Sequence, residues 1–166
     1  MLRSLLALAL AGAACAASAQ FSPAEDPDWK ESEAPPPPAL RTTGLIELDT
    51  PTSSMRFGVD PKSITVGADG IVRYVVVATS PSGVVNGIYE GIRCATGLVR
   101  VYARHNPDSG WVPARVDWTP VHEIRNSRHS LLVARNGACL GRGPNGGPEQ
   151  IARDLRSGVD RRFHTY

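Results

Sequence analysis

Residues 69–94 read DGIVRYVVVATSPSGVVNGIYEGIRC and predict two long strands joined by a tight turn. The first strand, Ile71–Thr79, is rich in β-branched residues and apolar on both faces, which predicts a central strand with at least one face fully covered. Ser80-Pro81-Ser82-Gly83 has the composition of a type I turn, with proline second and glycine fourth. The chain returns through Val84–Cys94, so the two strands are expected to pair antiparallel.

Shorter strands on both sides of this hairpin extend the predicted sheet. Apolar residues alternate with other residues in 55–59 and again in 64–66, which predicts two short strands before the hairpin. Residues 98–104 predict a further strand, which ends at the turn-forming residues 106–110. Because short turns join consecutive strands, the expected topology is an antiparallel meander.

The C-terminal third has a less regular pattern. Thr119-Pro120 predicts the start of a short helix, and Ser130–Arg135 predicts a strand. Pro148–Arg156 predicts a second helix, because its acidic residue lies early and Ile151 and Leu155 share one face. The predicted fold class is therefore α+β: an antiparallel β-meander sheet with one or two helices packed on one face.

The N-terminus, Met1–Ala19, has the features of a secretory signal peptide. Arg3 supplies a positive charge, Leu5–Ala14 forms a short apolar region, and Ala17-Ser18-Ala19 is a small-residue cleavage site. The apolar region is too short to span a bilayer as a helix. Export to the periplasm or the medium is therefore the expected location, with Gln20 as the first mature residue.

A lipid anchor at Cys15 is the alternative reading of the same segment. The small residues Ala13 and Ala14 before this cysteine suit a lipoprotein signal, but Gly12 stands where a larger aliphatic residue is usual. Cleavage after Ala19 is therefore favoured, and an outer-membrane lipoprotein remains the alternative. No later apolar segment is long enough to form a transmembrane helix.

Residues 20–52 predict an acidic, proline-rich, disordered tail, and residues 53–166 predict a single α+β domain. The tail is poor in apolar residues, so it is expected to bury too little surface to offset its ordering entropy. Pro35–Pro38 favours an extended polyproline conformation. Trp29 is expected either to dock on the domain or on a partner, or to be loosely held.

The charge distribution gives no indication of a nucleic-acid partner. Residues 20–60 hold eight acidic and three basic residues, whereas residues 61–166 hold 14 basic and eight acidic residues. The arginines are scattered singly through strand-like segments, with no basic run and no nucleic-acid-binding motif. A chain of this kind is expected to bind another envelope protein or an envelope polymer rather than nucleic acid.

Two cysteines remain after removal of the signal peptide, Cys94 and Cys139. Neither belongs to a Cys-x-x-Cys motif, and a zinc site would need a second pair of ligands at short spacing. An exported chain enters an oxidising compartment, where such a pair forms a disulfide. We therefore predict a Cys94–Cys139 disulfide and no metal site.

The sequence assigns no catalytic residue and no cofactor. His105, His122, His129 and His164 share no metal-ligand spacing, and the chain has no Gly-x-Ser-x-Gly motif. The glycine-rich residues 141–147 lack the Lys-Ser/Thr of a phosphate-binding loop. A small periplasmic hydrolase that uses a histidine and a carboxylate remains the alternative function, because members of a catalytic triad can lie far apart in sequence.

Glu90 is the polar residue whose predicted position needs an explanation. Strand alternation places it on one face with its apolar neighbours Ile88, Ile92 and Cys94. A carboxylate carried toward the core needs a partner, and Arg73 or Arg100 on neighbouring strands would supply it. Arg93 falls on the opposite face. These four charged residues, Arg73, Glu90, Arg93 and Arg100, predict a structural ion pair in preference to a ligand site.

Several short motifs resemble the CNP-one-like family of small exported bacterial proteins. The motifs are Arg56-Phe57-x-Val59-Asp60, Ser63-Ile64-x-Val66-Gly67, Asp69-Gly70-Ile71-Val72-Arg73-Tyr74, Tyr89-Glu90-Gly91-Ile92-Arg93-Cys94 and Val101-Tyr102-Ala103. The resemblance extends over about Trp29–Leu155. It implies a location in the cell envelope, with a lipid anchor in some members, but no catalytic residues and no assigned activity.

A looser likeness links the chain to the surface-adhesin protein E type of domain. Asp60-Pro61-Lys62-Ser63-Ile64 before a long strand, and Cys94 at the end of a later one, fit that layout. The likeness implies a sheet-based binding module. The expected function is therefore that of a non-enzymatic, exported cell-envelope protein, with the hydrolase as the alternative.

Overall fold

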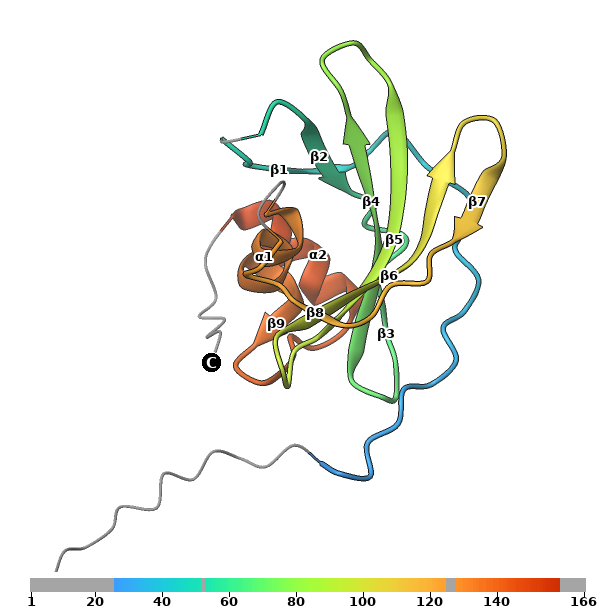
Figure 1. Ribbon diagram of the computed structural model, residues 1–166. Coiled ribbons are helices and arrows are strands. Elements are labelled where there is room, and N and C mark those ends of the chain that lie inside the picture. Colours follow the sequence, from blue (N-terminus) through green and yellow to red (C-terminus); the bar gives the residue numbers. More distant parts are fainter. Residues whose placement is uncertain (1–25, 52, 125–127, 159–166) are drawn as a thin grey trace, which may run out of the picture.

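The computed structural model describes residues 26–51, 53–124 and 128–158, so the predicted signal peptide and Cys15 lie outside the described residues. Its main feature is one antiparallel sheet in the order β1-β2-β4-β5-β6-β7, with β3 paired to β4 and β8 paired to β6 (Figure 1). The strands are β1 (Ile46–Leu48), β2 (Arg56–Val59), β3 (Thr65–Val66), β4 (Ile71–Thr79), β5 (Val85–Arg93), β6 (Leu98–Asn106), β7 (Gly110–Pro113) and β8 (Thr119–Pro120).

The predicted hairpin at the centre of the sheet is confirmed. Strand β4 pairs with β5 in a continuous register from Ile71 opposite Arg93 to Thr79 opposite Val85. The turn between them is closed by the Gly83 amide, which donates a hydrogen bond of 2.9 Å to the Ser80 carbonyl. Since β4 has β2 and β3 on one side and β5 on the other, its apolar faces are central, as its composition predicts.

Helices cover one face of the sheet, on the left in Figure 1, and confirm the α+β fold class. They are α1 (His129–Val133), the π-helix η1 (Ala134–Ala138) and α2 (Pro148–Ser157); a small hairpin of β9 (Cys139–Leu140) and β10 (Gly143–Pro144) lies between η1 and α2. Ile151 and Leu155 of α2 are buried against this face. The predicted helix at Pro148 is therefore confirmed, with the proline in its first turn.

Two local predictions in the C-terminal third are wrong. Residues 130–135, predicted as a strand, lie in α1 and η1, because a short apolar run has no periodicity that separates a strand from a buried helix. Thr119-Pro120, predicted as a helix start, forms the edge strand β8. Thr119 pairs with Val99 there, and an edge position tolerates the missing amide hydrogen of Pro120.

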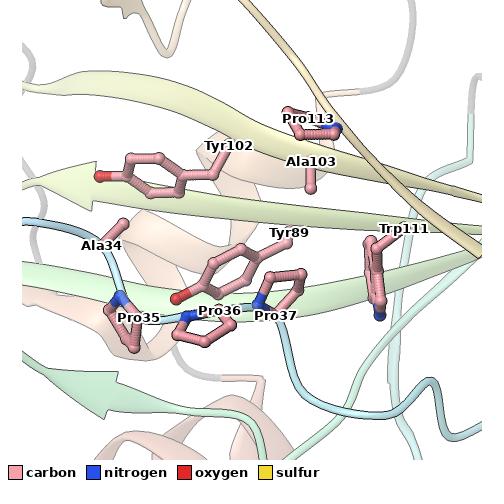
Figure 2. A pocket seen from close by; sticks show the side chains of 9 residues that line it. All are labelled: Ala34, Pro35, Pro36, Pro37, Tyr89, Tyr102, Ala103, Trp111 and Pro113. Carbon is pink, nitrogen blue, oxygen red and sulfur yellow. The ribbon is translucent and has the colours of Figure 1, made fainter.

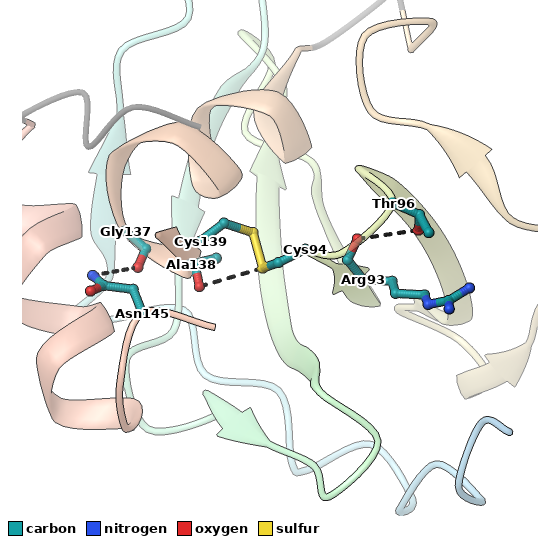
Figure 3. Close-up of a disulfide and its surroundings, with 7 residues drawn as sticks. All are labelled: Arg93, Cys94, Thr96, Gly137, Ala138, Cys139 and Asn145. Carbon is teal, nitrogen blue, oxygen red and sulfur yellow. Dashed lines mark hydrogen bonds between the residues drawn. A yellow bond between two sulfur atoms is a disulfide. The ribbon is translucent and has the colours of Figure 1, made fainter. Parts of the chain in front are cut away.

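The predicted Cys94–Cys139 disulfide is confirmed. It joins the end of β5 to the start of β9, with a Cα–Cα distance of 5.6 Å (Figure 3). Both cysteines are buried. Nearby, Asn145 donates a hydrogen bond of 3.0 Å from its side-chain amide to the Gly137 carbonyl. The disulfide therefore fastens the helical layer to the central hairpin.

The predicted disordered tail is wrong for the residues that the structure describes. Residues 46–48 form β1, which pairs with β2, and both Ile46 and Leu48 are buried. Residues 26–45 run along the face of the sheet opposite the helices, as the blue and cyan chain in Figure 1 shows. Leu40 and Leu45 pack there against the buried side chains of β4, β5 and β6.

The N-terminal segment is poor in apolar residues, and its composition therefore predicted disorder. Polar and aromatic contacts nevertheless hold it on the sheet. The indole nitrogen of Trp29 donates a hydrogen bond of 2.9 Å to the Asp69 carbonyl. Its ring lies 3.6 Å from the guanidinium carbon of Arg93. The prediction that Trp29 either docks or is loosely held is thereby settled in favour of docking on the domain.

We expect Trp29→Ala to lower the free energy of unfolding by about 2 kcal/mol, through the loss of one hydrogen bond and a cation–π contact. Urea denaturation measures this change. Lys30→Ala, at an exposed neighbouring position, is the matched control and should stay close to wild type. A Trp29→Ala variant as stable as the wild type would show that these contacts of Trp29 do not stabilise the domain.

Candidate binding groove

Glu90 points into the core as predicted, but its predicted arginine partners are wrong. In the register of the sheet, Glu90 lies opposite Tyr74, whereas Arg73 and Arg100 both lie opposite Gly91. Directly opposite residues share a face of the sheet, so both arginines project to the face away from Glu90. The predicted four-residue cluster is therefore split between the two faces.

Three side chains satisfy the Glu90 carboxylate. The Tyr74 hydroxyl donates a hydrogen bond of 2.6 Å and the Ser130 hydroxyl one of 2.9 Å to Oε1, while His129 Nε2 lies 3.1 Å from Oε2. Burial raises the pKa of Glu90, but the charge of His129 and these hydrogen bonds outweigh it and hold that pKa below its ordinary value. Two of these partners, His129 and Ser130, were not predicted, because neither residue was expected to lie in a helix.

The geometry of this cluster is that of a structural network. Ser130 donates to the carboxylate and not to His129, so the order of a Ser-His-acid triad is absent here. His129 also stacks on Phe57, with ring centroids 4.9 Å apart. Glu90, His129 and Ser130 are all buried, and none of them lines the three cavities described below. The cluster links α1 to the sheet.

Arg73, Arg93 and Arg100 lie on the other face of the sheet and bind the N-terminal segment. Arg73 forms a buried ion pair of 2.6 Å with Asp69 and also donates a hydrogen bond of 3.2 Å to the Ser32 carbonyl. Burial raises the pKa of Asp69, but the hydrogen bond from Arg73 and those from backbone amides outweigh it and lower that pKa. Arg100 pairs with Glu31 at 2.8 Å.

Between this segment and the sheet lies a groove made of two adjoining cavities of about 290 Å³ each. The apolar cavity has residues 34–37 on one side and Tyr89, Tyr102 and Trp111 on the other (Figure 2). The polar cavity shares Ala34 and Tyr102 with the apolar cavity. The rest of its lining is Glu31, Ser32, Glu33 and Arg100. We call the two cavities together the aromatic groove.

Aromatic side chains from three neighbouring strands build the apolar cavity. Tyr89 of β5 lies 5.5 Å from Tyr102 of β6 and 6.5 Å from Trp111 of β7, measured between ring centroids. The Trp111 indole nitrogen donates a hydrogen bond of 2.8 Å to the Pro38 carbonyl, which anchors the far end of the proline tract. Burial raises the pKa of the Tyr102 hydroxyl well above its ordinary value.

Two glycines of β5 make room for these rings. A Cβ atom at Gly91 would lie 2.9 Å from the Tyr102 ring, and one at Gly87 would lie 3.0 Å from the Trp111 ring and 2.7 Å from Leu40. Glycine inside a long strand often marks a place where another group approaches closely. Two glycines four residues apart lie on the same face of a strand, so their spacing could have indicated a close approach on that face.

The groove can bind apolar and aromatic groups at one end and a polar group at the other. No histidine lines either of its cavities. Among residues 26–51, 53–124 and 128–158 there is no group of three or more His, Cys, Asp or Glu side chains placed to hold a metal ion. Within the same residues, no helix is long and apolar enough to cross a membrane.

Comparison with known proteins identifies the family. No curated protein and no solved structure matches the chain. The model of the CNP1-like family matches residues 24–156, which covers most of the chain and includes the central hairpin, both cysteines of the disulfide and every residue that lines the aromatic groove. The chain therefore belongs to the CNP1-like family.

Proposed function

We propose that this protein is an exported, non-enzymatic binding domain of the cell envelope, and that it holds an extended segment of another envelope protein in the aromatic groove. The observation that carries the proposal is the apolar cavity between the proline tract and the rings of Tyr89, Tyr102 and Trp111. Aromatic-lined grooves of this kind bind extended, proline-containing segments, because such segments lose little conformational entropy on binding.

The polar cavity supports a preference for a partner segment with a basic residue. Glu31 is neutralised by Arg100, and Trp118 donates a further hydrogen bond of 3.2 Å to the same carboxylate. Glu33 is exposed and forms no ion pair with the described residues. A proline or aromatic side chain in the apolar cavity, followed by a lysine or arginine beside Glu33, fits both cavities of the groove.

Export is supported by the predicted signal peptide and by the buried disulfide, which forms in oxidising compartments. A periplasmic or secreted protein cleaved after Ala19 is the favoured form, and an outer-membrane lipoprotein anchored through Cys15 is the alternative. In the lipoprotein, the residues after Cys15 would connect the anchor to the docked segment that begins near Trp29.

Within the described residues, the alternative function, a small hydrolase, would use His129 with Glu90 as its carboxylate. In this pair, His129 Nε2 lies 3.1 Å from the Glu90 carboxylate. The pair is buried, and the neighbouring Ser130 hydroxyl donates its hydrogen bond to the Glu90 carboxylate. Binding in the aromatic groove is therefore the better-supported function.

We expect Trp111→Ala to reduce capture of the envelope partner by at least tenfold, because a tryptophan at the centre of a binding site commonly carries a large share of the affinity. The measurement is a pull-down from envelope fractions with the full mature chain as bait, quantified by mass spectrometry. Val112→Ala, on the exposed neighbouring residue, is the matched control. Trp111→Phe keeps an aromatic ring but removes the hydrogen bond to the Pro38 carbonyl. This variant therefore distinguishes loss of the partner contact from loss of the docked N-terminal segment.

Equal capture by wild type and Trp111→Ala would place the binding surface elsewhere. Recovery of a polysaccharide or peptidoglycan fragment in place of a protein would change the partner class from protein to polymer. Turnover of a captured molecule that survives Trp111→Ala but is lost in Glu90→Gln, at a temperature where this variant is still folded, would favour the hydrolase.

A further inference from the structure

A third cavity, of about 330 Å³, lies on the helical side of the molecule and shares no residue with the aromatic groove. Its walls come from two separate parts of the chain, the turn after β1 and the helices α1 and η1. The lining residues are Asp49, Thr50, Pro51, Arg128, Leu131, Leu132 and Arg135. Its volume falls at the small end of the range typical of small-molecule sites.

Two arginines that form no ion pair with the described residues line this cavity. Arg41, Arg73 and Arg100 each form an ion pair with a carboxylate, but neither Arg128 nor Arg135 forms one with the residues that the structure describes. The Nε atom of Arg135 is buried and has no hydrogen-bond partner. Buried donors are nearly always satisfied, so this Nε–H group lacks an acceptor that a bound anion would supply.

The backbone at Arg128 supports the same conclusion independently. With φ of 50°, Arg128 is the only non-glycine residue with positive φ among the described residues. An arginine in this conformation costs free energy that a glycine would avoid, and such strain concentrates at functional sites. The π-helix η1, which carries Arg135, is a second irregularity of the kind that is frequent at such sites.

We propose that this cavity binds a small organic carboxylate, with its charged group between the guanidinium groups of Arg128 and Arg135 and its apolar part against Leu131, Leu132 and Pro51. Arginine presents paired donors that match the two oxygen atoms of a carboxylate. Asp49 lines the same cavity and repels a second negative charge, which favours a monoanion over a phosphate dianion. The two leucines favour a ligand with an apolar chain or ring over a bare inorganic anion.

The test is calorimetric titration of the full mature chain with hexanoate as the probe. We expect saturable one-to-one binding of hexanoate, at least tenfold tighter than binding of hexanol, of the hexylammonium cation or of inorganic phosphate. Arg128→Gly removes the charge and relieves the positive φ, so it should fold as well as wild type and still bind hexanoate at least tenfold more weakly. Arg135→Met keeps the apolar stem of the side chain and should have the same effect on binding.

Arg153→Gln is the matched control, because Arg153 is an exposed arginine of α2 that does not line the cavity, and it should bind hexanoate as wild type does. Equal affinity for hexanol would show an apolar cavity without anion recognition, and equal affinity for phosphate would show a general anion site. Either result, or wild-type affinity in both arginine variants, would overturn the proposal. None of these outcomes depends on the aromatic groove, so the two proposals can fail separately.

Discussion

The double substitution Cys94→Ala and Cys139→Ala is expected to lower the free energy of unfolding by about 4 kcal/mol, the largest effect of any change considered for this chain. The two cysteines are separated by 45 residues, and closing a loop of this length restricts the unfolded chain strongly. For a domain of this size, such a loss should lower the melting temperature by roughly 10–15 °C. Thermal denaturation of both proteins without reductant measures the change.

The position of the disulfide predicts where the structure loosens first. Cys139 follows η1 directly, and η1 packs against α2, so loss of the tether should raise hydrogen exchange in β9, β10 and η1 before it does so in β4 and β5. Leu140→Ala, at an exposed residue next to Cys139, is the matched control and should change little. A double variant that loses less than about 1 kcal/mol would show that packing alone holds the helical layer.

The second large effect is expected for Glu90→Gln, which should lower the free energy of unfolding by about 3 kcal/mol. The substitution keeps the shape of the side chain but replaces a carboxylate oxygen by an amide group that donates hydrogen bonds. Tyr74 and Ser130 donate to Oε1 of Glu90, and His129 Nε2 lies at Oε2. The amide nitrogen of glutamine would therefore face either the two hydroxyl donors or His129, in place of an oxygen that accepts. Glu47→Gln, at an exposed position of β1, is the matched control.

The pH dependence of the same pair of proteins gives an independent check. The pKa of Glu90 is lower in the folded protein than its ordinary value of 4.5, so its carboxylate stabilises the fold above pH 4.5, and this contribution is lost as the pH falls through the folded value. The difference in stability between wild type and Glu90→Gln should therefore shrink as the pH falls below 4.5 and through the folded pKa of Glu90. A difference that stays constant down to pH 2 would contradict a charged Glu90.

Local pattern was sufficient for the central part of this fold. The alternation and turn composition of residues 71–94 predicted β4, β5 and their connection, because a two-residue period and a short turn leave one register that keeps the apolar side chains covered. The same alternation correctly predicted that the Glu90 side chain points into the core. Parity and the absence of other cysteine motifs were enough for the disulfide.

The partners of Glu90 could not be predicted, because they lie on an element whose type was ambiguous. Arg73 and Arg100 were expected to pair with Glu90 because they lie on the two neighbouring strands. In the register of the sheet, both lie opposite Gly91, so their side chains project from the other face. His129 and Ser130 reach the carboxylate only because residues 129–133 form a helix that packs over the sheet. A short apolar run acquires its conformation from that packing.

The N-terminal segment shows most clearly what only long-range contacts decide. Its composition predicts disorder, because a proline-rich acidic chain has too few apolar side chains to form a core of its own. In the folded protein the segment needs no core of its own, because three arginines of the sheet bind it. Arg73 contacts Ser32, Arg93 contacts Trp29, and Arg100 contacts Glu31. The aromatic groove exists only where this segment meets Tyr89, Tyr102 and Trp111, residues that are far from it in the sequence, so tertiary structure alone creates the site.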